Sequence, residues 1–212
     1  MNLLTKTGEK TLSTTVDYYF TPQSPWTYLG HERFAQLSNA AGARVRVLPI
    51  DLGGKVFPIS GGLPLGQRAP QRQAYRLLEL RRHADFLGLP LHVKPKYFPV
   101  SGDDASRLII AVDLHDGVDA AMKISGAIFT ALWAQERHIA SEKVLSELLD
   151  ECGLDAARLE QSYSQAVQER YEINTEQAIR AGVFGAPSYL VEGELFWGQD
   201  RLDFVERRLR AG

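Results

Sequence analysis

The spacing of hydrophobic positions along the chain changes several times, and each change predicts a different element. Residues 15–20 are crowded with aromatic and β-branched residues, which is typical of a strand. Apolar positions in residues 25–41 follow helical spacing instead, and Gly42 supplies a stop. Residues 45–50 are a second predicted strand. These three segments predict a βαβ unit with a right-handed crossover.

The middle of the chain is predicted to be almost entirely helical. Residues 51–70 come first, and they are so rich in Gly and Pro that we expect a functional loop or a linker. For the helix expected at residues 141–152, Ser141 is the predicted N-cap and Gly153 the predicted stop. The helical patterns lie at residues 71–86, 104–114, 118–135, 141–152, 155–159 and 162–181.

The C-terminal end returns to strand patterns. Residues 189–191 and 195–197 are two short strands joined by a tight turn, and a last helix is expected at residues 201–209. The order is βαβ, then a helical insert, then ββα. The predicted organisation has three parts. They are a flexible arm at 1–14, a core domain at 15–55 and 182–212, and a helical insertion subdomain at 56–181.

Two short motifs stand where the predicted strands end. Ser24-Pro25-Trp26-Thr27 lies between the first strand and the N-terminus of the first helix, where unpaired N–H groups and the helix dipole favour an anion such as a thiolate. Gly185-Ala186-Pro187-Ser188 precedes a later strand. This layout is typical of an α/β thioredoxin-like fold with an inserted all-α subdomain. Both cysteine positions of the usual Cys-x-x-Cys are hydroxyls here, so the thiol site lacks its thiol.

Composition narrows the function classes. The chain has 212 residues, a net charge of −2 and a pI near 6.2, so no overall field favours nucleic acid or an anionic membrane. No apolar run is long enough for a membrane span and no signal peptide is evident. With Cys152 as the one cysteine, no internal disulfide can form, and we expect a reducing cytoplasm.

Other chemistries lack their motifs. The five histidines are scattered, so we interpret them as structural or surface residues and expect no metal site. The sequence holds no G-x-S-x-G, P-loop or G-x-G-x-x-G, which argues against hydrolase, NTPase and Rossmann dehydrogenase functions.

The residues of the two motifs each have a functional and a structural interpretation. Ser24 could donate a hydrogen bond to a cofactor sulfur anion, or only cap the helix. Pro187 could be cis and expose the backbone of Ala186 to an extended ligand, or be an ordinary trans proline at an edge strand. The sequence leaves both pairs open.

Charged residues outside the motifs are similarly ambiguous. Asp200, helped by Gln199, could meet a ligand ammonium group or act as a helix cap. Arg68, Arg72 and Arg76 are spaced i, i+4, i+8, so they form either a stripe that attracts a carboxylated substrate or a solvated face. Lys55, in the loop after the second strand, is a candidate contact for a cofactor carboxylate.

Three segments together resemble one family of enzymes. Residues 17–30 (DYYFTPQSPWTYLG), 182–189 (GVFGAPSY) and 196–202 (FWGQDRL) are similar to 2-hydroxychromene-2-carboxylate isomerases, which are close to kappa-class glutathione transferases within the DsbA-like branch of thioredoxin folds. The likeness runs from about residue 15 to the end and includes 75–82 and 87–90 in the insert.

The resemblance implies a glutathione-dependent enzyme. It implies that Ser24 contacts the cofactor sulfur, that Pro25 and Trp26 line the pocket, and that Ala186, before a cis-Pro187, pairs with the cysteinyl backbone of glutathione. It also implies a homodimer.

The resemblance also implies that Gln199 and Asp200 bind the γ-glutamyl end of glutathione. One departure puts a cofactor contact in doubt. The family often has an Asn in the loop after the second strand, and Gly61-Gly62-Leu63-Pro64 offers no amide side chain there.

Three functional hypotheses follow. The first is an isomerase in which glutathione thiolate adds reversibly to a conjugated aromatic carboxylate, so that a double bond becomes a rotatable single bond. The second is a kappa-like transferase that conjugates electrophiles at the same site. The third is a non-catalytic module that binds peptides along the Pro187 edge. Disulfide oxidoreduction is disfavoured because Ser24 and Thr27 cannot cycle electrons and Cys152 has no partner cysteine.

Overall fold

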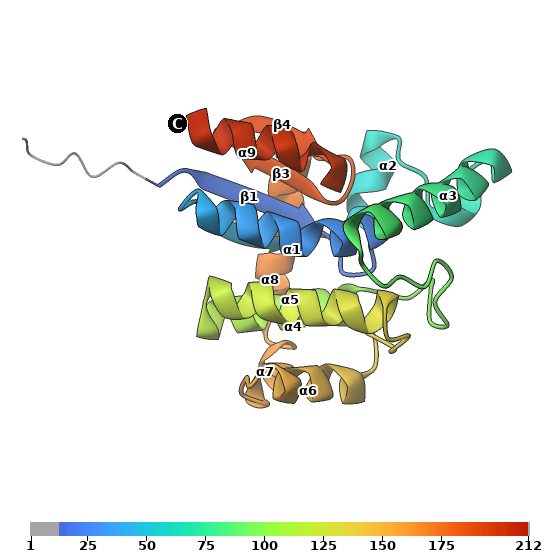
Figure 1. The fold of residues 1–212 in the computed structure, drawn as a ribbon. Helices are drawn as coiled ribbons and strands as arrows, with labels where there is room; N and C mark the ends of the chain where they lie inside the picture. The colour runs from blue at the N-terminus through green and yellow to red at the C-terminus, as the bar shows by residue number, and fades with distance from the viewer. Residues whose placement is uncertain (1–12, 212) are drawn as a thin grey trace, which may run out of the picture.

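The fold is organised around a four-stranded mixed sheet with the strand order β2-β1-β3-β4. A computed structural model of the chain describes residues 13–211 (Figure 1). The sheet contains a parallel pair and two antiparallel pairs, as a thioredoxin-like arrangement requires. Its strands are β1 (Thr15–Phe20), β2 (Arg44–Pro49), β3 (Ser188–Val191) and β4 (Glu194–Trp197). All four strands were predicted from the sequence, with boundaries that differ by at most one residue.

Alternation along β1 sends its side chains to two different cores. Val16, Tyr18 and Phe20 are fully buried in the larger core, which the sheet shares with the helices below it. Tyr19 points to the opposite face and packs with Leu48 in a smaller core. The central strand is therefore covered on both faces, which holds its C-terminal end in a fixed place.

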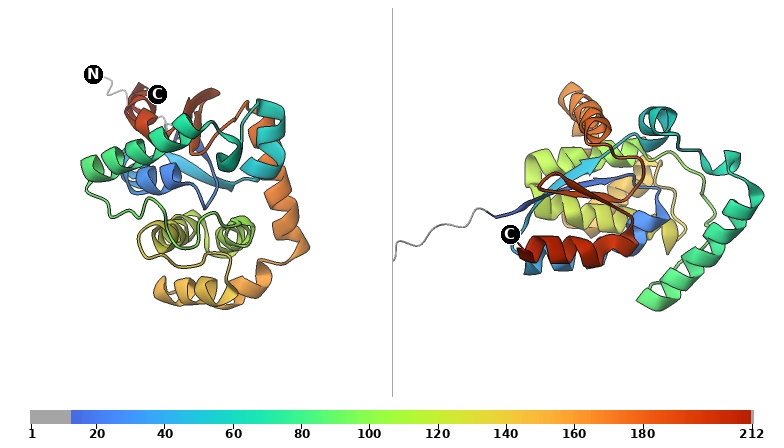
Figure 2. Two further views of the ribbon diagram at one scale, coloured as in Figure 1. Left: turned by 90° about the vertical axis from the view of Figure 1, so that its right-hand side faces the viewer. Right: turned by 90° about the horizontal axis from the view of Figure 1, so that it is seen from above.

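The helices form layers around this sheet. The α1 and α9 helices contact each other on one face, and α8 packs against the other face (Figures 1 and 2). The α4 and α5 helices lie beyond the β2 edge, with α6 and α7 outside them, while α3 projects from the sheet end where β1 meets α1 (Figure 1). The helices are α1 (Pro25–Ala40), α3 (Pro70–Leu87), α4 (Asp103–Asp116), α5 (Val118–Trp133), α6 (Glu142–Glu151), α7 (Ala157–Gln161), α8 (Gln165–Arg180) and α9 (Leu202–Ala211).

The Gly- and Pro-rich segment is more ordered than the loop predicted from its sequence. It contains a π-helical turn (Leu52–Val56), the short helix α2 (Phe57–Ser60) and a 3₁₀ turn (Leu65–Gln67). The Asp51 carboxylate starts the first turn by accepting the Gly54 N–H at 2.7 Å. These turns are too short to produce a helical period in the sequence, so only the tertiary structure reveals them.

One predicted cap is wrong in its chemistry. Ser141 occupies the N-cap position of α6, but its hydroxyl makes no capping hydrogen bond. Gly88 ends α3 in the left-handed conformation, at φ 66°, as a helix stop requires.

The domain boundaries proposed from the sequence stay a prediction. The 1–14 arm lies almost wholly outside the described residues. Within the segment 56–181, α8 packs directly on the sheet, whereas α6 and α7 lie far from it (Figure 2). Between residues 13 and 211, no helix combines the length and the apolarity that crossing a membrane demands.

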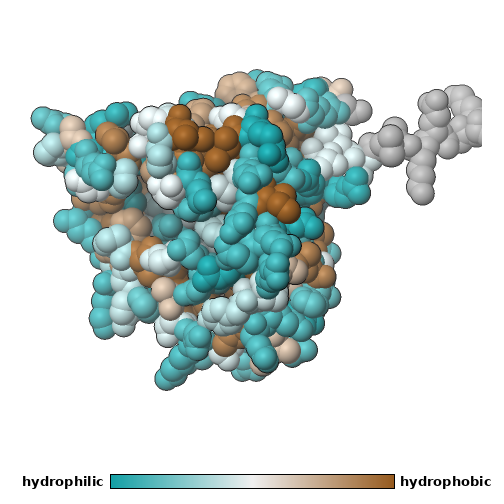
Figure 3. Space-filling view, turned by 180° about the vertical axis from the view of Figure 1, so that it is seen from behind, coloured by the Kyte–Doolittle hydropathy of each residue, from teal (hydrophilic) through white to brown (hydrophobic). Residues whose placement is uncertain are grey.

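The surface behind the sheet is mostly hydrophilic, with apolar side chains exposed in separate small groups (Figure 3). The exposed large apolar residues include Phe184 at 42% and Trp197 at 51%. These two rings pack edge to face on each other at 4.8 Å, beside the end of the sheet where the two sequence motifs meet.

Candidate functional site

The two sequence motifs meet at one corner of the sheet. The Ser24 hydroxyl donates to the Ala186 carbonyl at 3.3 Å, across 162 residues of sequence. It also accepts the Thr27 N–H at 3.3 Å, so Ser24 is the N-cap of α1. The Ala186–Pro187 peptide bond is cis. Capping and anion binding are compatible here, because Ser24, which is 8% exposed, also lines a pocket.

Free donors gather at this corner. Pro25 is the first residue of α1 and has no N–H, so the first helical donor is the N–H of Trp26. Within residues 13–211 neither this group nor the Ala186 N–H has a hydrogen-bond acceptor. The 16-residue helix adds the positive end of its dipole. The corner can therefore stabilise an anion with a hydroxyl and backbone N–H groups.

The two hydroxyls that replace the usual cysteines differ in access. Ser24 reaches the pocket, but Thr27 is fully buried and its Oγ1 has no hydrogen-bond partner within residues 13–211. A ligand can therefore contact only the first hydroxyl of the pair.

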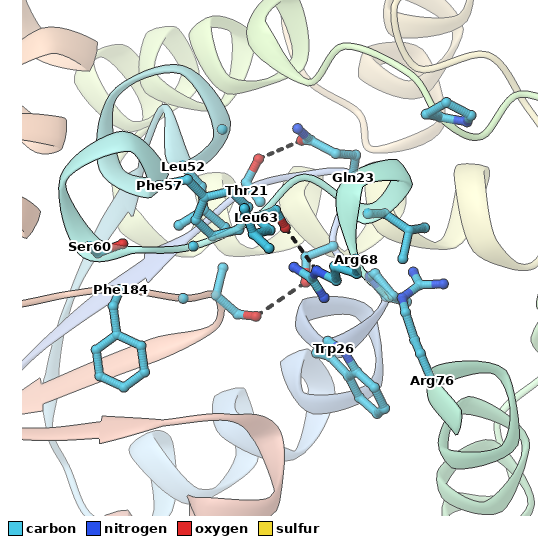
Figure 4. Close-up of a pocket in the computed structure, with 18 of the residues that line it drawn as sticks. Thr21, Gln23, Trp26, Leu52, Phe57, Ser60, Leu63, Arg68, Arg76 and Phe184 are labelled. Atoms are coloured by element: carbon cyan, nitrogen blue, oxygen red, sulfur yellow. Dashed lines mark hydrogen bonds between the residues drawn. The ribbon is translucent and has the colours of Figure 1, made fainter. Parts of the chain in front are cut away.

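A large pocket opens on one side of this corner. It has a volume of about 730 Å³, and we name it the apolar pocket because rings and aliphatic side chains dominate its lining (Figure 4). Gly61, Gly62 and Leu63, which offer no amide side chain, form part of its wall. The apolar side chains that line only this pocket include Leu52, Phe57, Leu63, Leu65, Phe98, Val100 and Phe184.

A second pocket lies on the other side of Trp26. It has a volume of about 580 Å³, and we name it the polar pocket because charged and amide side chains supply most of its lining. The α3 helix provides one wall and the 3₁₀ turn Gln199–Arg201 the other. The polar side chains that line only this pocket are Gln71, Tyr75, Glu79, His83, Gln199, Asp200 and Arg201.

Arginines separate the two pockets, so the predicted stripe is not a freely solvated face. Arg68, Arg72 and Arg76 line both pockets. The Arg76 guanidinium lies 5.5 Å from the centre of the Phe98 ring, and burial, with the nearby Arg68 charge, lowers its pKa to about 10. Burial also lowers the pKa of Arg68, and both Arg68 and Arg76 stay cationic at neutral pH. Among the described residues no carboxylate lies within 4.0 Å of these guanidinium groups.

Gln199 is fixed in the wall of the polar pocket. It is 3% exposed, and its Nε2 lies 3.0 Å from His83 Nδ1. Gly30 of α1 permits the close approach, because a Cβ there would stand 2.7 Å from the Gln199 Cβ. The His83 ring meets the Trp26 ring edge to face at 5.7 Å.

Asp200 is not the cap of the last helix. It lies inside the 3₁₀ turn that precedes α9, its side chain makes no capping hydrogen bond, and its carboxylate pairs with Arg201 at 3.0 Å. Its side chain is 48% exposed and lines the polar pocket beside Gln199. The structural interpretation considered for Asp200 is therefore wrong, and a ligand contact remains open.

Two other candidates lie away from both pockets. Lys55 is exposed on the turn after β2 and lines neither pocket. Pro187 is buried behind Ala186, where its carbonyl accepts the Gly198 N–H at 2.9 Å. Ala186, the residue before the proline, lines both pockets, whereas Pro187 lines neither.

Sequence reasoning missed several site residues, above all His83. It was grouped with the other histidines as structural or surface. A signal was available, because Arg72, Arg76, Glu79 and His83 share one face of a helix at spacings of four, three and four. The interpretation is right for His31, which is buried and bonded to the Met122 carbonyl at 2.9 Å. In residues 13–211, no three His, Cys, Asp or Glu side chains gather as a metal site.

Comparison with known proteins gives a consistent result. Residues 15–210 match the family model of the DSBA-like thioredoxin domain. A 2-hydroxychromene-2-carboxylate isomerase of Pseudomonas sp. (strain C18) is 30% identical over 196 residues, which are 90% of this chain and 88% of the relative. Human glutathione S-transferase kappa 1 is 24% identical, over 93% of this chain and 92% of the relative.

A solved structure agrees with these sequence relatives. The structure of a 2-hydroxychromene-2-carboxylate isomerase superposes with a TM-score of 0.77 at 28% identity, covering 93% of this chain and 95% of that chain. The match therefore includes the helical segment as well as the sheet. The chain belongs to the DSBA-like thioredoxin domain family, within the branch that contains the 2-hydroxychromene-2-carboxylate isomerases.

Proposed function

We propose that the protein is a glutathione-dependent isomerase that acts on a conjugated aromatic carboxylate. One observation carries the proposal: the Ser24 hydroxyl and the Ala186 backbone meet at 3.3 Å where an apolar and a polar pocket join. Such a junction suits a cofactor that places its thiol there and its polar groups in the polar pocket, while an aromatic substrate occupies the apolar pocket. The similarity to named isomerases supports the same reaction class.

The residues of the site fit glutathione by their chemistry. Its thiolate needs donors, which Ser24 and the Trp26 N–H supply. Its cysteinyl backbone needs a donor and an acceptor in extended geometry, which the Ala186 N–H and carbonyl supply. Its α-ammonium group needs acceptors, which Gln199 and Asp200 supply. Its carboxylates need cations, and the arginines between the pockets have no carboxylate partner among the described residues.

Ser24 and the start of α1 supply the charge stabilisation. A hydroxyl and helix N-terminal donors lower a thiol pKa from its ordinary value of about 8.5 by roughly 1–3 units. The hydrogen bond of Ser24 to Ala186 is long, at 3.3 Å, so the hydroxyl can turn to a stronger acceptor with little loss. When bound, glutathione would supply a thiol nucleophile for reversible addition to a conjugated carbon and for elimination after rotation about the resulting single bond, and Ser24 with the Trp26 N–H would hold its sulfur.

The apolar pocket supplies substrate binding. Phe57, Leu63 and Phe98 offer faces for an aromatic ring. Arg68 and Arg76 lie at its border, where a substrate carboxylate can pair with a guanidinium in a partly desolvated place. The protein thus contributes positioning and a preorganised anion site.

Calorimetry and a mutant test the proposal. Glutathione should bind the protein with a dissociation constant in the micromolar to millimolar range, and Ser24→Ala should slow isomerisation of a chromene carboxylate. Absence of glutathione binding, or unchanged turnover in Ser24→Ala, would contradict the proposal.

The second candidate is conjugation of glutathione to an electrophile. The match to human glutathione S-transferase kappa 1 over nearly the whole chain favours it. The two reactions use the same site and differ in whether the adduct is released. Assaying a conjugated electrophile beside a chromene carboxylate separates them, since only conjugation consumes glutathione. A peptide-binding module would instead capture peptides without preferring a γ-glutamyl group. A homodimer and a cytoplasmic location remain proposals beside this function.

A further inference from the structure

Gln199 has one side-chain bond that decides how its amide faces the polar pocket. The amide is nearly buried, and the two groups of its side chain are opposite in character: Nε2 donates and Oε1 accepts. Nε2 lies 3.0 Å from His83 Nδ1, and Oε1 has no hydrogen-bond partner in the part of the chain that the structure describes. Whatever fixes Nε2 therefore determines which atom is offered to a ligand.

Glu79 determines the role of the His83 ring. Its Oε2 lies 3.7 Å from His83 Nε2, on the side of the ring away from Gln199. A carboxylate oxygen at this place favours the tautomer with the proton on Nε2, which leaves Nδ1 as an acceptor. The Arg82 hydrogen bond lowers the pKa of Glu79 and keeps it ionised. Nδ1 then accepts from the Gln199 amide, and the amide carbonyl is left for the pocket.

The surroundings hold this arrangement still. Gly30 lets α1 press against the Gln199 stem, and the edge of Trp26 packs on the His83 ring. The His83 ring is contacted by Glu79 on its own helix, by Trp26 on α1 and by Gln199 on the 3₁₀ turn. Within residues 13–211, His83 Nδ1 is the one hydrogen-bond partner of Gln199 Nε2.

We propose that His83 is a positioning residue, oriented by Glu79, which turns the Gln199 carbonyl into the polar pocket so that it and Asp200 accept the ammonium group of a γ-glutamyl ligand. Reversing the amide would present two N–H donors to that cation and repel it. The ligand part of this inference rests on the proposed function, whereas the orientation of the amide does not.

The orientation is tested in the ligand-free protein by nitrogen NMR of His83. We expect the Nε2–H tautomer, with a Gln199 side-chain amide proton protected from exchange. The Glu79→Gln variant should weaken the preference for that tautomer. A proton on Nδ1, or a Gln199 amide that exchanges like an exposed one, would overturn the inference whether or not any ligand binds.

The consequence for binding is tested by calorimetry with glutathione and with cysteinylglycine, which lacks the γ-glutamyl group. His83→Phe keeps a ring against Trp26 but has no acceptor, and should weaken glutathione binding about 5–10-fold with no change for cysteinylglycine. His83→Asn restores an acceptor near the Nδ1 position and should recover most of the affinity. His115→Phe, on the exposed end of α4, is the control.

The outcomes separate the two proposals. If the unaltered protein binds no glutathione, the proposed function fails and the NMR result still decides the orientation. If it binds glutathione and His83→Phe binds equally well, the positioning role is wrong. In steady-state kinetics of His83→Phe, a higher KM for glutathione with unchanged kcat supports the positioning role. An equal loss of affinity for glutathione and cysteinylglycine would show that His83 has only a structural role.

Discussion

The two pockets on either side of Trp26 are built from different chemistry. The apolar pocket takes its rings from α2, the 91–103 segment and the loop before β3, whereas the polar pocket takes amide and charged side chains from α3 and the turn before α9. Only Trp26, Ala186, Trp197 and the three arginines serve both. The corner that can stabilise an anion therefore lies between a pocket suited to an aromatic molecule and a pocket suited to a molecule that carries both positive and negative charges.

The arginines have a different meaning on each side. Facing the apolar pocket, Arg76 lies over Phe98 and is mostly desolvated, so a carboxylate gains strongly by pairing with it. Facing the polar pocket, the same stripe shares the lining with Asp200 on the opposite wall and with Glu79 of its own helix. The comparison therefore predicts that most substitutions will mainly affect the binding of either glutathione or the aromatic substrate. Substitutions in α1, whose start contributes to both pockets, should affect both ligands.

The largest expected effect concerns the buried His31 of α1, the helix whose start contributes to both pockets. It tests whether the two pockets lose their structure together. Burial lowers the folded-state pKa of His31 from 6.5 to about 4. Below pH 6.5 the unfolded chain takes up a proton that the folded protein refuses, so stability falls as the pH drops toward 4. The loss is on the order of 3 kcal/mol.

Urea unfolding at several pH values measures this loss. His31→Gln should show a shallower fall of stability between pH 6.5 and 4 than the unaltered protein. Both pockets should disappear in one transition, because both are built on the start of α1. An equal fall of stability with pH in the two proteins, or separate unfolding transitions for the two pockets, would contradict the idea that both pockets depend on α1.

The next effect is at the junction of the pockets. Ser24→Ala removes one donor from the anion site and should lower kcat/KM roughly 100-fold while raising the pKa of bound thiol. Ultraviolet absorbance of the thiolate and steady-state kinetics measure both. Thr27→Val is the matched control, since it replaces a buried hydroxyl that has no partner and should leave activity and stability nearly unchanged.

The third effect should be largest in the apolar pocket. Arg76→Met keeps the apolar stem and removes the charge, so KM for a carboxylated substrate should rise roughly 20-fold. Glutathione binding should fall less, because Arg68 and Arg72 remain as cations for its carboxylates. Arg81→Met, on an exposed part of α3 outside both linings, is the control. A neutral analogue of the substrate should lose no affinity in Arg76→Met. An equal loss for the neutral analogue would show that packing, not charge, is at work.

The smallest effect should be confined to the polar pocket. Asp200→Asn should weaken glutathione binding about fivefold, because the exposed carboxylate is well screened by water. Binding of an aromatic carboxylate alone should not change. Asp203→Asn, in the exposed ion pair with Arg33, is the matched control. Calorimetry with the two ligands in turn distinguishes a polar-pocket effect from a general one.

Much of the fold could be predicted because the signals are local. The strands carry dense apolar runs, the long helices carry a 3.6-residue period, and glycines mark where helices end. The turns between Asp51 and Gln67 could not be predicted, because each is shorter than the window in which a period is visible. The side-chain caps expected at Ser141 and considered for Asp200 do not form, since a residue type permits a cap but does not impose one.

The sequence by itself determined the strand order along the chain, the hydroxyl at the start of α1 and the small residue before Pro187, because these are properties of neighbouring residues. Only the tertiary structure decided that Ser24 touches Ala186, that the arginines separate two pockets and that His83 holds Gln199. Each of these contacts joins positions far apart in the chain. Their geometry depends on how helices pack on a sheet, and no local pattern encodes that packing.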